Sequence, residues 1–292
     1  MKRGSVALIV PPEDRKFVEA EIAPRRSGIR IVSGPALPAT TDRDRDLSLL
    51  FIRSGTLLGS PGPVTELVLD YWAADPRGSV VFFEGKEKET KLQTRFHQLV
   101  FEFAAQRPPR ARSYIAPDPA AVRRLVLARQ HGAEDQLIAS ARYENGMLKV
   151  WSCEPRLYRC PVAKIPALAA LSEEQRHRLS VSESGSRLHW PDGDIDLDLS
   201  SLKTIADPRF LEQKRRQFRE EAARYGSAIR TLREKHGLRQ RDIEGLSARE
   251  LRRLEKGETF PHGGTIAKLA MAHGMSAGEY LAKLAAIERR GS

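Results

Sequence analysis

The sequence predicts a multi-domain protein in which an α/β part, a small α+β part and an all-α part follow one another along the chain. Short apolar runs alternate with helical patterns over the first part, which indicates a mostly parallel sheet with helices on both faces. Two hairpin signals follow, and the remainder carries helical periodicity with capping residues. The predicted divisions are residues 1–134, 135–207, a connecting helix at 208–225, and 226–292.

The N-terminal part is predicted to be a Rossmann-like α/β sheet. Apolar runs bounded by Gly, Pro or charged residues give its expected strands at 5–10, 29–33, 47–53, 79–84 and 112–116. Helical periodicity between these runs gives expected helices at 13–23, 63–74, 89–105 and 119–129. This alternation is typical of doubly wound sheets, which bind ligands at the carboxyl ends of their strands.

Glycines follow three of these strands, in Ser33-Gly34, Ser54-Gly55 and Glu84-Gly85-Lys86. None of these segments matches a dinucleotide fingerprint or a phosphate loop, and glycine at a strand exit is more often only a turn. If a small effector binds this part of the chain, we expect it at Ser54, Gly55, Glu84 and Lys86.

The middle part is predicted to contain a small antiparallel sheet. Segments 136–143 and 147–154 alternate in polarity around Asn145-Gly146, a strong signal for a two-residue hairpin, and a second pair of segments flanks Ser184-Gly185. Trp190 could recognise a ligand, but a large ring beside a proline is more often a core residue.

The middle part ends on His189-Trp-Pro-Asp192, followed by alternating carboxylates up to Asp198. Together with the segments before it, this ending resembles a small α+β bacterial domain family of uncharacterised function. Members of that family are often found in gene neighbourhoods that resemble toxin–antitoxin modules. The same acidic segment lacks the glycine and the closing glutamate of a calcium loop.

A capped, basic helix is predicted in the last quarter of the chain. Ser247 and Glu250 have the spacing of a capping box, and Gly257 is placed to end the helix. Leu251 and Leu254 lie at buried spacing, so the helix would expose Arg249, Arg252 and Arg253. These arginines could be a merely solvated face, but the agreement of cap, turn and helix end favours recognition.

Residues 225–286 resemble the lambda-repressor-like, or XRE, helix-turn-helix family, which implies a five-helix DNA-binding domain. The resemblance implies that Arg233 pairs with Glu255 and that Gln240 supports both a phosphate contact and the recognition helix. It places Ala248 and the three arginines toward the bases, with Arg249 as the first choice for guanine. The second helix, 240–244, is about three residues shorter than the family pattern. The expected DNA-contacting set is Arg239, Gln240, Ser247, Ala248, Arg249, Arg252, Arg253 and Lys256.

The charge distribution agrees with a nucleic-acid partner. Residues 207–292 hold 19 Lys/Arg against 12 Asp/Glu, which is +7 of the total net charge of +11. No apolar run reaches the roughly 20 residues of a membrane helix, and the first residues lack the apolar length of a signal peptide. We therefore expect a cytoplasmic protein whose two cysteines, Cys153 and Cys160, are reduced.

Residues for catalysis or metal binding are not evident. His97 and His131 lack a nucleophile, a paired carboxylate or a metal-spaced partner, so we expect no metal, no cofactor and no enzymatic activity. The sequence predicts a sequence-specific transcriptional regulator that binds double-stranded DNA as a homodimer. Its N-terminal part would sense a small molecule or associate with a protein.

Two alternatives remain open. An antitoxin-like or adaptor protein would hold a protein partner and regulate its own gene, and it would co-purify with that partner. A DNA-targeted enzyme would use the N-terminal α/β part and lose turnover on changes of Glu84 or Lys86.

Overall fold

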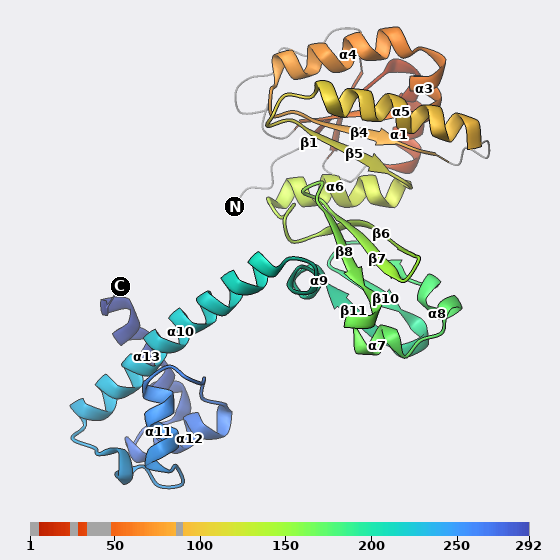
Figure 1. Cartoon of the computed structure of the whole chain (residues 1–292). Helices are drawn as coiled ribbons and strands as arrows, with labels where there is room; N and C mark the ends of the chain where they lie inside the picture. Colours follow the sequence, from red (N-terminus) through yellow and green to blue (C-terminus); the bar gives the residue numbers. More distant parts are fainter. Residues whose placement is uncertain (1–5, 24–28, 34–47, 86–89, 292) are drawn as a thin grey trace. The chain divides into compact units, whose positions relative to one another are not determined.

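The computed structural model describes residues 6–23, 29–33, 48–85 and 90–291 (Figure 1). The chain divides into two compact units, Met1–Ala206 and Asp207–Ser292. The first contains a five-stranded parallel sheet and two small antiparallel sheets, and the second is helical. The chain is therefore a multi-domain α/β protein, as the sequence predicts.

The parallel sheet has the strand order β2-β1-β3-β4-β5. All five predicted strands are present: β1 Val6–Val10, β2 Ile29–Ser33, β3 Ser48–Arg53, β4 Ser79–Phe83 and β5 Arg112–Ala116. This order is that of a doubly wound sheet whose winding reverses between β1 and β3. Strands β1, β3 and β4 are almost wholly buried, because helices cover both faces of the sheet.

Two helices cover each face. Helices α1 (Arg15–Glu21) and α6 (Pro119–His131) pack on one face, and α4 (Pro61–Ala74) and α5 (Thr90–Gln106) pack on the other. Each was predicted, although the first turn of the 13–23 segment is a 3-10 turn, η1 (Pro12–Asp14). Helix α3 (Ser54–Gly59) was not predicted, because six residues are too few to show helical periodicity.

The middle part of the chain forms two three-stranded antiparallel sheets, and both predicted hairpins are confirmed. The first hairpin turns at Asn145 (φ 50°) and Gly146 (φ 74°), the left-handed pair of a tight hairpin turn. Trp190 is 1% exposed, and its Nε1 donates to Arg176 O at 3.1 Å, so it is a core residue. The strands are β6 Ile138–Glu144, β7 Met147–Ser152, β8 Leu157–Pro161, β9 Ser180–Val181, β10 Arg187–Trp190 and β11 Ile195–Asp198. The helical segments are η2 Val162–Lys164, α7 Pro166–Ala169, α8 Glu173–His177, η3 Pro191–Gly193 and α9 Leu199–Ala206.

The α/β sheet and the middle part share one core. Ala139 and Cys153 belong to the apolar cluster that contains β1 and α6. The buried Arg124 donates from Nε to Ala139 O at 2.8 Å, and the Tyr114 hydroxyl donates to Cys153 O at 2.7 Å. Burial raises the pKa of the Cys153 thiol to about 12, so this unpaired cysteine is protonated and unreactive at neutral pH.

The C-terminal unit begins with a long helix, α10 (Pro208–Lys235), followed by α11 (Ala248–Glu255), α12 (Gly263–Ala272) and α13 (Ala277–Gly291). The predicted connecting helix and the first helix of the unit are one continuous helix, because Gly226 is buried within α10 and does not end it. The predicted helix 240–244 is only a 3-10 turn, η4 (Gln240–Asp242), because Ile243 is extended at ψ 100°. The described residues of the C-terminal unit thus contain four α-helices and one 3-10 turn in place of the five predicted helices.

His273 lies in the core of this unit with one ring nitrogen unsatisfied. Its Nδ1 bonds Leu269 O at 2.6 Å, while its buried Nε2 has no partner among the described residues. The rings of His236 and Tyr280 pack against it with centroids 5.1 and 5.0 Å away. Burial is the largest cause that lowers the pKa of His273, and His236, Arg233 and Lys283 add to it.

This lowered pKa predicts that the C-terminal unit loses stability in mild acid. The unfolded chain takes up a proton near pH 6.5 while the folded His273 stays neutral, so stability is full above about pH 6.5 and falls below it. The slope for one such group is at most about 1.4 kcal/mol per pH unit. Thermal unfolding of the full chain between about pH 7.5 and pH 5 measures this, and His273→Phe should flatten the curve. An unchanged slope in this variant would assign the acid sensitivity to other groups.

Candidate nucleic-acid interface

Helix α11 begins at a complete capping box. Ser247 Oγ accepts from Glu250 N at 3.2 Å, and Glu250 Oε2 accepts from Ser247 N at 2.9 Å. The Ser247 hydroxyl also donates to Glu250 Oε2 at 2.7 Å. This bond, followed by the one from Ser247 N, lowers the pKa of Glu250, so the carboxylate stays charged beside the helix N-terminus. The predicted start of the helix is confirmed.

The two sides of α11 differ sharply in burial. Leu251 is 0% exposed and Leu254 6% exposed, whereas Arg249, Arg252 and Arg253 are exposed. Arg253 Nε lies 3.3 Å from Glu258 Oε2, and the described residues offer no ion-pair partner to Arg249 or Arg252. Helix α11 therefore packs on the core through its leucines and presents its arginines to solvent.

The end of α11 is held by a buried ion pair. Arg233 on α10 donates from Nε to Glu255 Oε1 at 2.5 Å and from Nη2 to Oε2 at 3.2 Å, and Nη1 donates to Leu238 O at 2.6 Å. The Gln240 amide donates to Glu255 Oε2 at 2.7 Å. The two charged side chains are only 9% and 5% exposed, and the bond to Glu255 raises the pKa of Arg233. This network joins α10, the η4 turn and α11.

Two glycines let α10 and α11 approach at backbone distance. A Cβ on Gly226 would lie 2.3 Å from Leu254 O, and one on Gly257 would lie 2.5 Å from Ala223 N and Cα. Gly257 also has φ 69°, the left-handed conformation that ends α11. Its predicted role as the helix stop is confirmed, and the close approach to α10 is a second reason for glycine.

The other predicted DNA-contacting residues surround this helix. Arg239, Ser247 and Lys256 are exposed, while Ala248 and Gln240 are half-buried. Lys268 of α12 was not predicted as part of the site. Its Nζ donates to Gly245 O at 2.7 Å and so fixes the turn before α11. No local pattern signals this contact, because 23 residues separate its partners.

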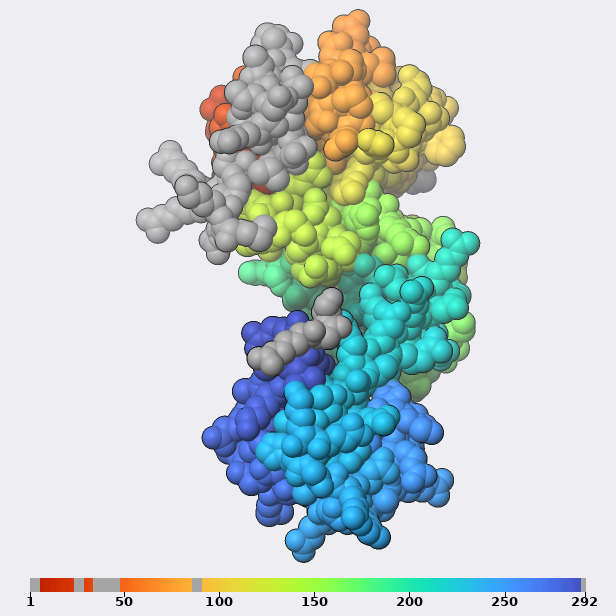
Figure 2. Space-filling model, turned by 90° about the vertical axis from the view of Figure 1, so that its left-hand side faces the viewer, coloured from red at the N-terminus to blue at the C-terminus, as the bar shows by residue number. Residues whose placement is uncertain are grey.

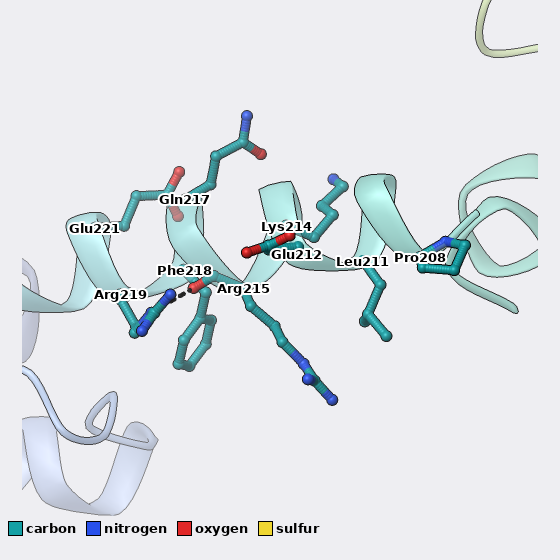
Figure 3. A pocket seen from close by; sticks show the side chains of 9 residues that line it. All are labelled: Pro208, Leu211, Glu212, Lys214, Arg215, Gln217, Phe218, Arg219 and Glu221. Atoms are coloured by element: carbon teal, nitrogen blue, oxygen red, sulfur yellow. Dashed lines mark hydrogen bonds between the residues drawn. The ribbon is translucent and has the colours of Figure 1, made fainter.

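The first half of α10 carries an open groove of about 1050 Å³. Figure 3 shows Leu211, Arg215 and Phe218 on one side of the helix. Phe218 is 52% exposed and packs edge-on against Phe260, with ring centroids 4.9 Å apart. In Figure 2 the turquoise and cyan side chains of this segment stand at the surface. An apolar stripe therefore reaches solvent between charged side chains.

The predicted effector residues do not form one open site. Ser54 is 3% exposed and starts α3, with Gly55 beside it and Gly85 close to its hydroxyl. Glu84 instead pairs with His97 at 3.2 Å and lines a separate hollow. Lys86 lies outside the described residues.

Beyond the carboxyl ends of β1 and β3, a buried carboxylate links the two segments. Asp14 is 1% exposed and accepts from Arg53 N at 3.2 Å and from Thr56 Oγ1 at 2.8 Å. Burial, the largest effect, raises its pKa despite these bonds. The carboxylate thus anchors the start of α3.

The described residues contain no cluster of three or more His, Cys, Asp or Glu that could hold a metal ion. Within the same residues, no helix combines the length and the apolar character needed to traverse a lipid bilayer.

Comparison with known proteins characterises the middle part of the chain. Residues 138–207 match the family model described as "Protein of unknown function (DUF2442)". This match covers β6 to α9 and confirms the predicted small domain of uncharacterised function. No curated protein and no solved structure matches the chain. The resemblance of residues 225–286 to XRE proteins stays a prediction.

Proposed function

We propose that the protein is a cytoplasmic, sequence-specific transcriptional regulator of the XRE, lambda-repressor-like type, which binds double-stranded DNA without bond chemistry. The observation that carries this proposal is the exposed arginine face of α11 on a helix fixed at both ends. The capping box holds its start, and the pair between Arg233 and Glu255 holds its end. A helix that is already held in place loses less entropy on binding than a mobile one.

The dimensions of α11 suit a major groove. Eight residues give a helix about 12 Å long, comparable with the roughly 12 Å width of the groove in B-DNA. Arg249 in the first turn would meet guanine O6 and N7 with two donors, a pairing worth about 1–3 kcal/mol of discrimination. Arg239 and Lys256 would contact phosphates on either side, together with Gln240, which also holds Glu255.

The proposed regulator acts as a homodimer through the exposed stripe of α10. Leu211 and Phe218 lie seven residues apart on α10, and Phe218 and Phe260 leave apolar surface open. Two copies would place two recognition helices on paired half-sites, because one helix covers little DNA. The unit Met1–Ala206 would then supply sensing of a signal or association with a protein partner.

Selection from random duplexes tests DNA recognition directly. We expect the full chain at moderate salt to enrich one motif. Arg249→Ala should lose preference at one guanine position by about 1–3 kcal/mol, or roughly 5- to 150-fold. Arg289→Ala, which removes an equally exposed arginine from α13, should keep the motif and only weaken binding slightly.

Lys256→Ala should weaken binding to all duplexes alike and lower the slope of affinity against salt by about one unit. If the full chain enriches no motif, or if Arg249→Ala and Arg289→Ala yield identical motifs, the proposal of sequence-specific recognition fails.

A further inference from the structure

A cleft lies beside β5 within the Met1–Ala206 unit. It consists of two hollows of about 330 and 250 Å³. Both are lined by His97, Ile115, Ser140 and Trp151, so they adjoin one another. Helix α5 forms one wall, and the β6–β7 hairpin forms the other. Their size matches sites for small molecules.

The floor of this cleft is the free edge of β5, the last strand of the parallel sheet. Arg112 N donates to Gly78 O at 3.1 Å and Ala116 O accepts from Glu84 N at 3.0 Å, so these two residues face β4. Backbone direction alternates along a parallel strand. The N–H and C=O groups of Ser113 and Ile115 therefore point away from β4, and the described residues supply no hydrogen-bond partner to them.

These groups form a recognition edge. The Ser113 carbonyl and the Ile115 amide lie side by side around Tyr114, as an acceptor next to a donor. A ligand matches this pair when its own N–H stands next to its own C=O or ring nitrogen, as in a lactam or a nucleobase. Such paired bonds discriminate strongly, because an ill-matched ligand that covers these backbone groups leaves them unsatisfied.

The walls favour a flat ligand. Trp151 is partly exposed, and the guanidinium of Arg142 lies 5.2 Å from the centroid of its ring, so the two form an extended stacking surface. Phe101 on α5 is 75% exposed beside them. The space between the walls exists because alanines line it, namely Ala104, Ala116, Ala121 and Ala139.

The charged side chains at the rim of the cleft restrict the charge of the ligand. The Glu84 carboxylate, 3.2 Å from His97 Nε2, borders the cleft, while Arg142 is already paired with Glu144 at 3.5 Å. Among the described residues at this rim, a phosphate group on the ligand would meet the Glu84 carboxylate, while the Arg142 guanidinium already stacks on Trp151 and pairs with Glu144. An uncharged ligand is favoured on this ground.

We propose that this cleft binds an uncharged planar heterocycle with an amide-like edge, such as a nucleobase or nucleoside. The ligand stacks at Trp151 and pairs with the Ser113 carbonyl and the Ile115 amide. This site goes beyond DNA binding and does not depend on it, since all its residues belong to the Met1–Ala206 unit.

Titration of the full chain with adenine, hypoxanthine, cytosine and uracil tests the site. Trp72 and Trp190 are 2% and 1% exposed, so saturable quenching of tryptophan fluorescence reports on Trp151. We expect quenching by at least one base, with shifts of the Ser113 and Ile115 amide resonances in nitrogen-15 spectra. The matching nucleoside monophosphate should bind at least about tenfold more weakly.

Ala104→Leu fills the cleft from α5 and should weaken binding about tenfold or more. Its control is Ala105→Leu, the exposed neighbour on the same helix, which does not line the cleft and should bind like the parent. The proposal is overturned if no base saturates, if the two leucine variants behave alike, or if the monophosphate binds as well as the base. As a further control, the full chain is titrated with the extended peptide trivaline. If the Ser113 and Ile115 amide resonances shift with trivaline and with none of the bases, the edge of β5 pairs with a peptide strand and the proposal is overturned.

Discussion

Arg233→Ala should lower the free energy of unfolding of the C-terminal unit by about 3–5 kcal/mol, enough to unfold a marginal domain. The variant leaves the Glu255 carboxylate 5% exposed with only the Gln240 amide as a partner. It also removes the donor to Leu238 O. A buried charge without its counter-ion is far more costly than a lost surface pair.

Circular dichroism of the full chain during denaturant unfolding measures this loss. The control is Arg230→Ala, one turn earlier on α10, whose arginine is 64% exposed and pairs with Glu234 at 2.8 Å. Because solvent screens this exposed pair, its loss should change the free energy of unfolding far less than the loss of Arg233. The double variant Arg233→Met with Glu255→Leu should recover much of the stability, because no charge then remains buried. Equal losses in Arg233→Ala and Arg230→Ala would show that the buried pair stabilises nothing.

Gly226→Ala should destabilise the same unit by about 1–3 kcal/mol, although alanine is the better helix former by about 1 kcal/mol. The new Cβ would lie 2.3 Å from Leu254 O and 2.8 Å from Glu255 O, which are backbone atoms that no side-chain rotation can move away. The end of α11 would have to separate from α10. Because Glu255 belongs to that end, its bonds to Arg233 would weaken as well.

A matched control is Gly278→Ala in the first turn of α13, where an added Cβ meets nothing within 4 Å. Because the added Cβ meets no atom, this variant should keep the parent's free energy of unfolding or raise it by up to about 1 kcal/mol. Melting temperatures of the two variants separate the two effects. Similar melting temperatures would mean that α10 and α11 tolerate a wider separation than their glycines suggest.

The sequence predicts regular elements well where periodicity is strong. All five parallel strands and both hairpins were predicted, because buried strands are continuously apolar and Asn145-Gly146 specifies its turn chemically. The continuity of α10 was not predicted. The predicted division fell between residues 225 and 226, whereas Gly226 lies inside α10 and its backbone approaches Leu254 O, 28 positions further on.

The site was predicted unevenly for the same reason. Ser247 and Glu250 were found from local spacing, while the pair of Arg233 and Glu255 followed only from a family resemblance. The hydrogen bond from Lys268 and the free edge of β5 depend on which elements become neighbours in space. Short-range sequence patterns do not predict contacts between elements that are distant along the chain.

The glycine contact between α10 and α11 has a mechanical consequence. Because Gly226 and Gly257 have no side chains, the backbones of α10 and α11 pack directly against each other. The ion pair of Arg233 with Glu255 also fixes the end of α11 to α10. The first turns of α10 protrude beyond the core of the unit. A partner that binds those turns and rotates α10 would therefore rotate α11 and its arginines with it.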